Sequence, residues 1–306
     1  MIRYVSIKLA RALLTLLLVV SFAFVVLRVA GDPVRTMMPD DVSPKVIEHY
    51  RQLWGLDRPL WEQYLRYIGS VLRGDFGVSF QDNRGVISLI VDRLPATLRL
   101  GIPAYLLAVV FGTAMGIIAA LRRNSATDRG MMTIAVFGYA MPNFFLGIVL
   151  ILIFSVWLRV LPSSGDTRPA SIVLPMITLA TAHAAAIARF ARSAMLEILN
   201  EPYMRTARAK GLSAMARNLR HALPNALVPI VTIMGLKFGH LVAGAIVIET
   251  VFAWPGIGRL LVQSVDARDL AVVQALVLMM AASMITANFI VDLFYGLIDP
   301  RVRARK

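Results

Sequence analysis

The chain has no cysteine among its 306 residues. This absence excludes disulfide bonds, thiolate nucleophiles and cysteine-based metal sites. Histidine is nearly as scarce, and its four positions lack the H-x3-H spacing that brings two imidazoles to one metal ion. The sequence therefore predicts no metal site. The four residues are His49, His183, His221 and His240.

Motifs of nucleotide binding and hydrolysis are missing as well. The chain contains no G-x-x-x-x-G-K-S/T phosphate loop, so we expect it to bind no ATP and no other cofactor itself. None of Ser163, Ser164 and Ser283 lies in the G-x-S-x-G context of a hydrolase nucleophile. An intramembrane enzyme would also need a base or paired acids at membrane depth, and no convincing pair is present. We therefore expect a non-catalytic protein.

Charged residues are few and apolar residues are abundant, at 16% and 58% of the chain. Six apolar runs reach the roughly 20 residues with which a helix crosses the hydrocarbon core of a bilayer. They predict an all-α polytopic membrane protein with six transmembrane helices, and this even number places both termini on one side. The runs extend over about Leu9 to Ala30, Ala96 to Leu121, Met131 to Leu158, Ile172 to Ala191, Leu227 to Val251, and Ala271 to Ile298.

Basic residues are distributed unevenly between the predicted loops. They outnumber acidic residues by 32 to 18 and cluster before the first run, between the second and third, between the fourth and fifth, and after the sixth. By the positive-inside rule, these loops and both termini face the cytoplasm. The formal net charge of +14 therefore reports membrane topology, and no nucleic-acid partner is expected.

The segment 31–95 lies outside the cell in this topology, and it is too polar to span and too aromatic for a plain linker. Its pattern predicts three helices, and a proline is expected to end the third. Their apolar stripes have two compatible explanations: packing of the segment on itself and on the membrane surface, or docking of an external protein. The predicted helices run from Pro44 to a stop at Gly55, from Pro59 to Arg73, and from Val86 to Leu94 before Pro95.

The cytoplasmic segment from Asn200 to Leu227 is basic and helix-forming, yet it joins two strongly apolar runs. Asn200 is a possible helix cap, and Gly211 and Pro224 are expected to break the segment into short helices. Small residues near Gly211 would let another surface approach the backbone, while neighbouring arginines supply charge. The same pattern also fits an amphipathic segment lying on anionic lipid headgroups.

This segment resembles the cytoplasmic loop of ABC importer permeases, whose pattern is Glu-Ala-Ala, three residues, Gly, nine residues, then Ile-x-Leu-Pro. The chain keeps Ala207, Gly211, Leu223 and Pro224 of that pattern. It departs from it at Arg205, Thr206 and His221. These departures are typical of one branch, the dipeptide, oligopeptide and nickel importers. In that branch, YMRTARAKGLS and RHAL are typical sequences.

The resemblance to the B-type subunit of that branch extends over nearly the whole chain. Further sequence blocks typical of that subunit lie in the external segment, at the start of the second run, and around the last two runs. They are GDP at Gly31 to Pro33, GLDRPLWEQYLRY at Gly55 to Tyr67, RGDFG at Arg73 to Gly77, RLPATL at Arg93 to Leu98, ETVFAWPGIGRLL at Glu249 to Leu261, and DLFYGLIDPRVR at Asp292 to Arg303.

The resemblance implies a fold and a set of partners. The fold is an ABC importer permease core in a prokaryotic inner membrane, with a helical external insertion between transmembrane helices 1 and 2. The partners are a second, C-type permease subunit, two cytoplasmic ATPase subunits that bind ATP and magnesium, and an external substrate-binding protein. A short helix at about Glu201 to Lys210 is expected to sit in a groove of an ATPase. The residues of this ATPase-coupling site are Glu201, Tyr203, Arg205, Thr206, Ala207, Arg208, Lys210, Gly211, Leu223 and Pro224.

Polar residues inside the predicted spans are candidates for a translocation path. Lys237 is about 15 Å along the fifth helix, near the bilayer midplane, and His240 follows on the same face. A charge at that depth is costly unless it faces water or a partner. We hypothesise that Lys237 and His240, with Asn143 and Asn288, line the path and attract an anionic group such as a peptide carboxylate. Interhelical hydrogen bonds are the alternative for the asparagines.

For Lys237 and His240 the alternative is a structural ion pair or hydrogen bond, to Glu249, to Asp292 or to the partner permease. Glu249 also opens the block ETVFAWPGIGRLL, whose proline and glycines force irregular backbone near the external face. We hypothesise that this block belongs to an external gate, although a plain re-entrant turn would share its pattern. The gate residues are Glu249, Pro255, Gly256 and Gly258.

The leading hypothesis is a permease subunit of an ATP-driven importer of small peptides, forming half of the translocation path. Residues 1–30 form the tail and first helix, 31–95 the external segment, 96–299 the five-helix core with the coupling loop 197–226, and 300–306 a basic cytoplasmic tail. A self-sufficient secondary transporter or channel is the alternative, supported by charged residues inside the spans. It predicts uptake that follows an ion gradient without any ATPase.

Overall fold

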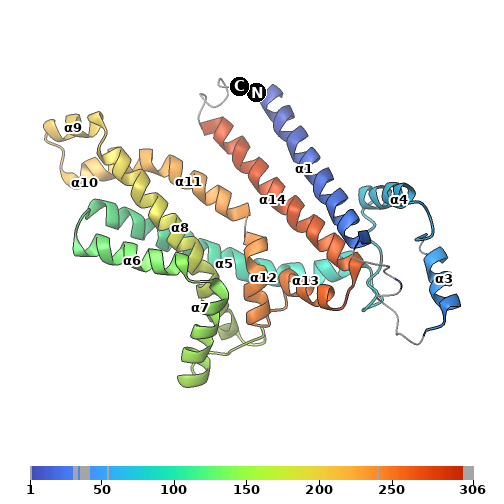
Figure 1. The fold of residues 1–306 in the computed structure, drawn as a ribbon. Helices are drawn as coiled ribbons and strands as arrows, with labels where there is room; N and C mark the ends of the chain where they lie inside the picture. The colour runs from blue at the N-terminus through green and yellow to red at the C-terminus, as the bar shows by residue number, and fades with distance from the viewer. Residues whose placement is uncertain (1, 30–33, 35–41, 54, 240, 299–306) are drawn as a thin grey trace.

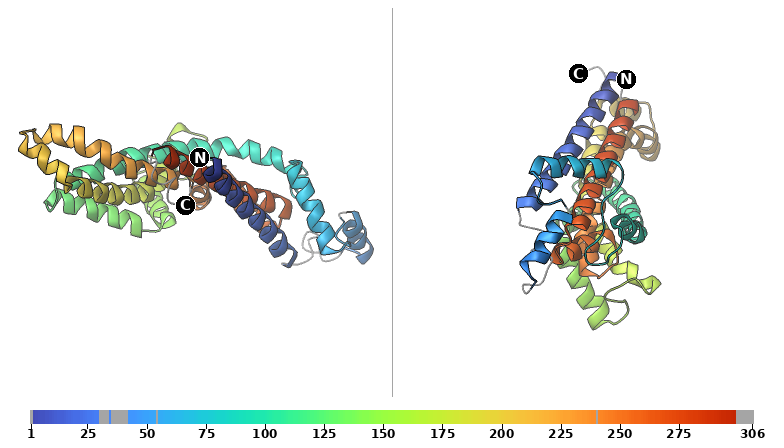
Figure 2. Two further views of the ribbon diagram at one scale, coloured as in Figure 1. Left: turned by 90° about the horizontal axis from the view of Figure 1, so that it is seen from above. Right: turned by 90° about the vertical axis from the view of Figure 1, so that its right-hand side faces the viewer.

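The computed structural model describes residues 2–29, 34, 42–53, 55–239 and 241–298, and these residues are mainly helical (Figure 1). The only β pairing among them is an isolated antiparallel bridge between Val78 and Gly85. The helices form an elongated arrangement, with α9 (Pro202–Ala209) towards one end and α3 (Pro44–Leu53) at the other (Figure 2). The predicted all-α class is confirmed.

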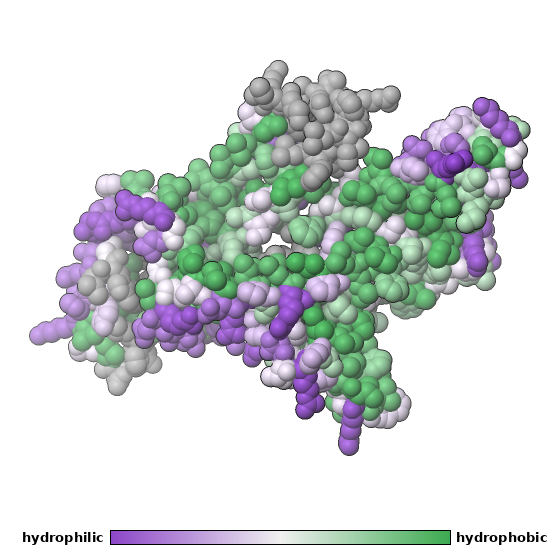
Figure 3. Space-filling model, turned by 180° about the vertical axis from the view of Figure 1, so that it is seen from behind, coloured by the Kyte–Doolittle hydropathy of each residue, from purple (hydrophilic) through white to green (hydrophobic). Residues whose placement is uncertain are grey.

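Two long apolar helices from opposite ends of the chain pack side by side. They are α1 (Ile2–Val29) and α14 (Leu270–Ile298), and the start of α1 and the end of α14 lie at the same end of the pair (Figure 1). Broad hydrophobic areas cover the rear face of the molecule, with hydrophilic side chains gathered towards its margins (Figure 3). Exposed leucines such as Leu14 and Leu18 contribute to this apolar exterior, as a lipid-facing surface requires.

The core is built on the contact between α5 (Val86–Leu121) and α8 (Val173–Leu199). Glycine makes this contact close, because a Cβ atom added at Gly112 would lie 2.6 Å from the carbonyl oxygen of Ala184. Gly116 meets the carbonyl of Ala188 in the same way one turn later. Small residues at such positions let two membrane helices approach backbone to backbone.

Among the described residues, five helices are long and apolar enough to span a membrane, and a sixth candidate is a bent pair. The pair joins α6 (Ala126–Ala140) to α7 (Asn143–Leu150) and the π-helical turn η1 (Ile151–Trp157), at an angle of 103°. We expected one continuous helix over this run. The break has a local cause: Met141 precedes a proline and is extended, with φ −73° and ψ 124°, because a following proline disfavours helical backbone.

The fifth predicted span also differs from the structure. Helix begins earlier, at α10 (Ala214–Arg217), and continues through the π-helical turn η3 (Asn218–Ala222) into α11 (Leu223–Gly239). A separate helix, α12 (Leu241–Val251), follows. Pro224 therefore does not break the segment as expected, since the wider π turn before it relieves the clash of its ring with the preceding turn.

The external segment contains two of the three predicted helices. They are α3 and α4 (Leu60–Leu72), and both agree closely with the predicted ranges. The third is wrong as a separate element, because α5 starts at Val86 and continues through Pro95 and Pro103. Prolines are tolerated in membrane helices when neighbouring groups satisfy the freed carbonyls.

The helix α4 packs on α1. The ring centroid of Phe24 lies 5.4 Å from that of Tyr64 and 5.6 Å from that of Tyr67, and the Tyr64 hydroxyl is hydrogen-bonded to Ser21 Oγ at 2.6 Å. This contact supports the packing explanation for the apolar stripe of α4.

Candidate functional site

The predicted coupling helix is present as α9, although its cap is not the one expected. Asn200 ends α8 instead, and its side-chain amide donates to the carbonyl of Leu196 at 2.9 Å. Glu201 precedes α9 without a side-chain capping bond, and Pro202 is the first helical residue. Proline suits that position because its φ is already helical. The backbone N–H that proline lacks would have no partner in the first turn of a helix.

Gly211 ends α9 through backbone geometry that favours glycine. Its φ is +78°, and its N–H donates to the carbonyl of Arg208 at 3.0 Å, while Leu212 N–H donates to Ala207 at 3.3 Å. These two bonds form a Schellman motif. Ser213 then caps α10 by accepting a hydrogen bond from Ala216 N–H at 3.2 Å. The two short helices on either side of Gly211 are thus confirmed.

The helix α9 has an inner and an outer face. Met204 and Ala207 are buried, and Met204 packs in a cluster with Met195 of α8 and Ala226 and Ile230 of α11. Ala207 is only 7% exposed, so its small size serves packing within this chain rather than the approach of another surface. The outer face carries the exposed residues Tyr203, Arg205, Thr206 and Arg208, and Lys210 and Gly211 just after the helix are exposed as well. At the start of α11, Leu223 is half-buried and Pro224 is exposed.

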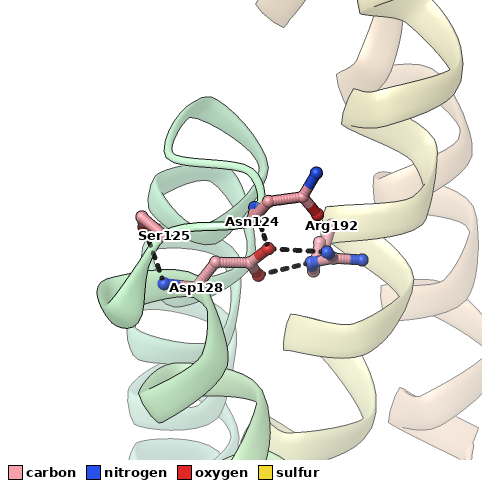
Figure 4. Close-up of polar contacts among 4 residues, drawn as sticks. All are labelled: Asn124, Ser125, Asp128 and Arg192. Carbon is pink, nitrogen blue, oxygen red and sulfur yellow. Dashed lines mark hydrogen bonds and ion pairs between the residues drawn. The ribbon is translucent and has the colours of Figure 1, made fainter.

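A partly buried ion pair holds α6 to α8 (Figure 4). Arg192 donates from Nε to Asp128 Oδ1 and from Nη2 to Oδ2, both at 2.7 Å. Asp128 also accepts from Asn124 N–H at 2.9 Å, and its own N–H donates to Ser125 Oγ at 3.2 Å. The charge bias of the loops does not predict this pairing. The signal in the sequence was the spacing of Ser125 and Asp128, which is typical of a helix start.

The path candidates are not joined to one another. Lys237 in α11, Asn143 at the start of α7 and Asn288 in α14 are all half-buried. No side-chain hydrogen bond or ion pair links these three within the described part of the chain. His240 and the side chain of Asp292 lie outside the described residues.

Glu249 is engaged away from Lys237, so the alternative of an ion pair between these two residues is wrong. Its side chain is fully buried, and Oε1 accepts a hydrogen bond from Thr97 Oγ1 at 2.6 Å. Its Oε2 accepts from the N–H groups of Gly258 at 2.7 Å and Arg259 at 3.1 Å. Glu249 therefore caps α13 (Ile257–Asp266), where unpaired N–H groups favour a carboxylate.

The proline and glycine residues of this block make the irregular turn that the sequence predicts. A Cβ atom at Gly256 would collide with the Glu249 carboxylate, and one at Gly258 would collide with the backbone of Ile246. Thr97 also accepts from Ile257 N–H at 2.8 Å, which joins the turn to α5. Thr97 was missed as a site residue because its partners are far away in sequence.

A polar cavity of about 490 Å³ lies beside this turn, and Pro255 lines it. Arg99 on its wall pairs with Asp166 at 2.5 Å and lies 5.0 Å from the centre of the Trp254 ring. Arg93 also lines it, without a side-chain partner among the described residues. The cavity is thus a charged hollow beside the predicted gate.

Helices packed through glycine contacts, a broken third span and a basic loop helix make up a fold that is shared with two solved structures. The first of the two solved structures with this fold is an inward-facing MetNI methionine ABC transporter. It has a TM-score of 0.53 and 23% identity over 67% of this chain and 95% of that chain. The other is an amino acid ABC transporter with histidines, with a TM-score of 0.52 and 19% identity over 68% and 93% of the two chains.

Sequence comparison defines the family. Residues 112–304 match the binding-protein-dependent transport system inner membrane component, and residues 1–101 match the N-terminal region of the same kind of component. The chain belongs to this family. It is 45% identical to the glutathione transport system permease protein GsiC of Escherichia coli K12 over 304 residues, covering 99% of both chains. The GsiC protein of Salmonella paratyphi A is 46% identical with the same coverage.

Membership of this family makes the chain a membrane permease component of an ABC importer. Such a component is non-catalytic, resides in the inner membrane with several spans, and works with a partner permease and ATPase subunits. This membership favours the importer over a self-sufficient secondary transporter or channel.

Proposed function

We propose that this chain is the B-type permease subunit of an ATP-driven importer of small peptides. The observation that carries the proposal is 45% identity to a glutathione transport permease over 99% of both chains. Glutathione is itself a small anionic peptide, and this chain carries a basic residue, Lys237, inside a predicted span that could attract it. An external substrate-binding protein would deliver the peptide, and a C-type permease would form the other half of the path.

The outer face of α9 is the surface we assign to the ATPase. Its exposed Arg205 and Arg208 offer charge, and Tyr203, which is 40% exposed, offers an aromatic contact. The inner face is fixed by Met204 to the cluster that includes α8 and α11. Because packed cores move as units, a displacement of α9 by the ATPase would be passed to both spans.

We assign the attraction of anionic substrate to Lys237. It is half-buried in α11, and no side-chain partner within the described chain neutralises it. A charge in a membrane helix without a partner requires water or a ligand. An aqueous path between this chain and its partner permease would provide both, with Asn143 and Asn288 as further lining.

The transport complex itself provides the test. The assembled transporter would be reconstituted in liposomes, and its ATP hydrolysis measured with binding protein loaded in turn with a dipeptide, an oligopeptide, glutathione or a nickel chelate. We expect stimulation by the dipeptide or glutathione. Stimulation only by the nickel chelate would refute the peptide assignment, whereas uptake by the chain without ATPase subunits would refute the coupling.

A further inference from the structure

An apolar cavity of about 470 Å³ lies between α1, α4, α5 and α14. Its lining includes Leu17 of α1, Val71 of α4, and Ala275 and Ala282 of α14. Both α1 and α14 are long and apolar enough to cross a bilayer. A hollow between two such helices adjoins lipid, so its natural occupant is a hydrocarbon chain.

A second cavity of about 210 Å³, with polar side chains on part of its wall, adjoins the first. The two share Phe76 and Ala275 on their walls. The second is lined by Tyr67 of α4, Asp75 after that helix, and Gln274 of α14. Together they make one amphipathic site with an apolar body and a polar mouth, which matches the two parts of a phospholipid.

Tyr67 provides an independent sign of a missing ligand. Its hydroxyl is buried and has no hydrogen-bond partner in the described part of the chain. Stacking on Phe24 at 5.6 Å holds the ring in place. A buried hydroxyl normally has a partner, because leaving it unpaired after removal from water is unfavourable. An ester or phosphate oxygen of a headgroup would satisfy it.

The charge at the polar mouth favours a cationic group. Asp75 Oδ1 accepts a hydrogen bond from Gly77 N–H at 2.9 Å, and Oδ2 has no partner within the described residues. Its negative charge attracts an ammonium group and repels an anionic headgroup.

The length of the site suits one leaflet. From Gln274 at the polar mouth to Ala282 in the apolar cavity is eight residues of α14. At about 1.5 Å per residue this is roughly 12 Å, slightly less than half of a hydrocarbon core of about 30 Å.

We propose that these joined cavities bind one phospholipid with an amine-bearing headgroup, of which phosphatidylethanolamine is the simplest. One acyl chain lies between α1 and α14, the ammonium group faces Asp75, and Tyr67 donates to a headgroup oxygen. The lipid thereby ties the external helix α4 to the span pair. This site is independent of the transported substrate.

Photocrosslinking of the assembled transporter in nanodiscs tests the site. Two probes carry the same photoreactive acyl chain, one on phosphatidylethanolamine and one on phosphatidylglycerol, and labelled peptides are identified by mass spectrometry. We expect the phosphatidylethanolamine probe to label the α1 and α14 peptides that line the cavity more strongly than the phosphatidylglycerol probe does.

Three variants sharpen the outcome. Tyr67→Phe keeps the stacked ring and should lower phosphatidylethanolamine labelling about fivefold, as expected for one lost hydrogen bond. Asp75→Asn should reduce the preference between headgroups, and Ala282→Phe should block labelling by both probes. Tyr139→Phe is the matched control, since Tyr139 of α6 lines neither cavity and should change nothing.

Two results would overturn the proposal. Equal labelling by the two probes in the unchanged transporter would mean ordinary boundary lipid without headgroup recognition. Absence of labelling, together with crosslinks from a photoreactive residue at Leu17 into the partner permease, would show that protein covers the groove.

Discussion

The carboxylate of Glu249 accepts a hydrogen bond from Thr97, although 152 residues separate the two in the chain. Both side chains are fully buried, and each also accepts from backbone N–H groups at the start of α13. This pair fixes the irregular turn of the predicted gate to the core helix α5.

Replacement of Glu249 by Gln should destabilise this turn. With its oxygen towards the two N–H groups, the amide presents donor hydrogens to Thr97, so the Thr97 hydroxyl loses its acceptor. An unsatisfied buried group costs about 1–3 kcal/mol. We expect a lower midpoint of thermal unfolding in detergent. Thr97→Ser, which keeps the hydroxyl, should resemble the unchanged protein, and Thr97→Val should not. Equal midpoints for Ser and Val at position 97 would contradict the structure.

The contact between α5 and α8 should respond sharply to a single methyl group. Gly112→Ala places a Cβ against the Ala184 carbonyl at 2.6 Å, so the helices must separate. We expect poor recovery of folded protein, measured by size-exclusion chromatography with fluorescence detection. Gly130→Ala is the matched control, because its Cβ meets nothing within 4 Å. In α6 it should be neutral or stabilise by about 1 kcal/mol, and a loss equal to that of Gly112→Ala would refute the argument.

The ion pair of Asp128 and Arg192 should be strongly coupled. Removing one partner of a buried pair costs about 3–5 kcal/mol, and we expect the lower end because the Arg192 side chain is 25% exposed. A double-mutant cycle with Asp128→Asn and Arg192→Gln, followed by chemical unfolding, measures the coupling. Additive effects of the two changes would contradict the bidentate geometry.

The outer face of α9 should bind the ATPase through charge. Arg205→Glu reverses an exposed charge, so we expect about tenfold weaker association with the ATPase subunits and a smaller effect at high salt. Copurification with the ATPase subunits would measure the association, and ATP hydrolysis by the assembled complex would measure its effect on activity. Arg73→Glu makes the same change at an exposed position on α4's C-terminal side and should leave association unchanged. Equal losses in both variants would contradict a specific coupling surface.

Lys237 should influence uptake of anionic substrates. Lys237→Gln removes the charge, and we expect slower transport of glutathione in liposomes, while Lys237→Arg keeps the charge and should retain most of it. A neutral dipeptide analogue would report any general defect. Unchanged uptake of every anionic substrate by Lys237→Gln would remove the path hypothesis for this residue.

Sequence patterns predicted structure best where it depends on residues close together in the chain. Pro44, Gly55 and Gly211 marked helix ends correctly because proline and glycine constrain the backbone within one turn. They were misleading at Pro95 and Pro224, where surrounding helix continued through the proline. A single-sequence pattern does not report which neighbours satisfy the freed carbonyl.

The membrane location, the helical class and the short helices of the basic loop follow from the sequence, because hydropathy and local backbone preference act over a few turns of chain. The family resemblance also lay in the order of residues and was confirmed by comparison. Tertiary structure alone decided that Asp128 pairs with Arg192, that Glu249 caps α13 rather than meeting Lys237, and that Ala207 faces inwards. Such pairings depend on which distant segments pack together. A buried contact stabilises the protein only when tertiary packing brings both partners together away from water.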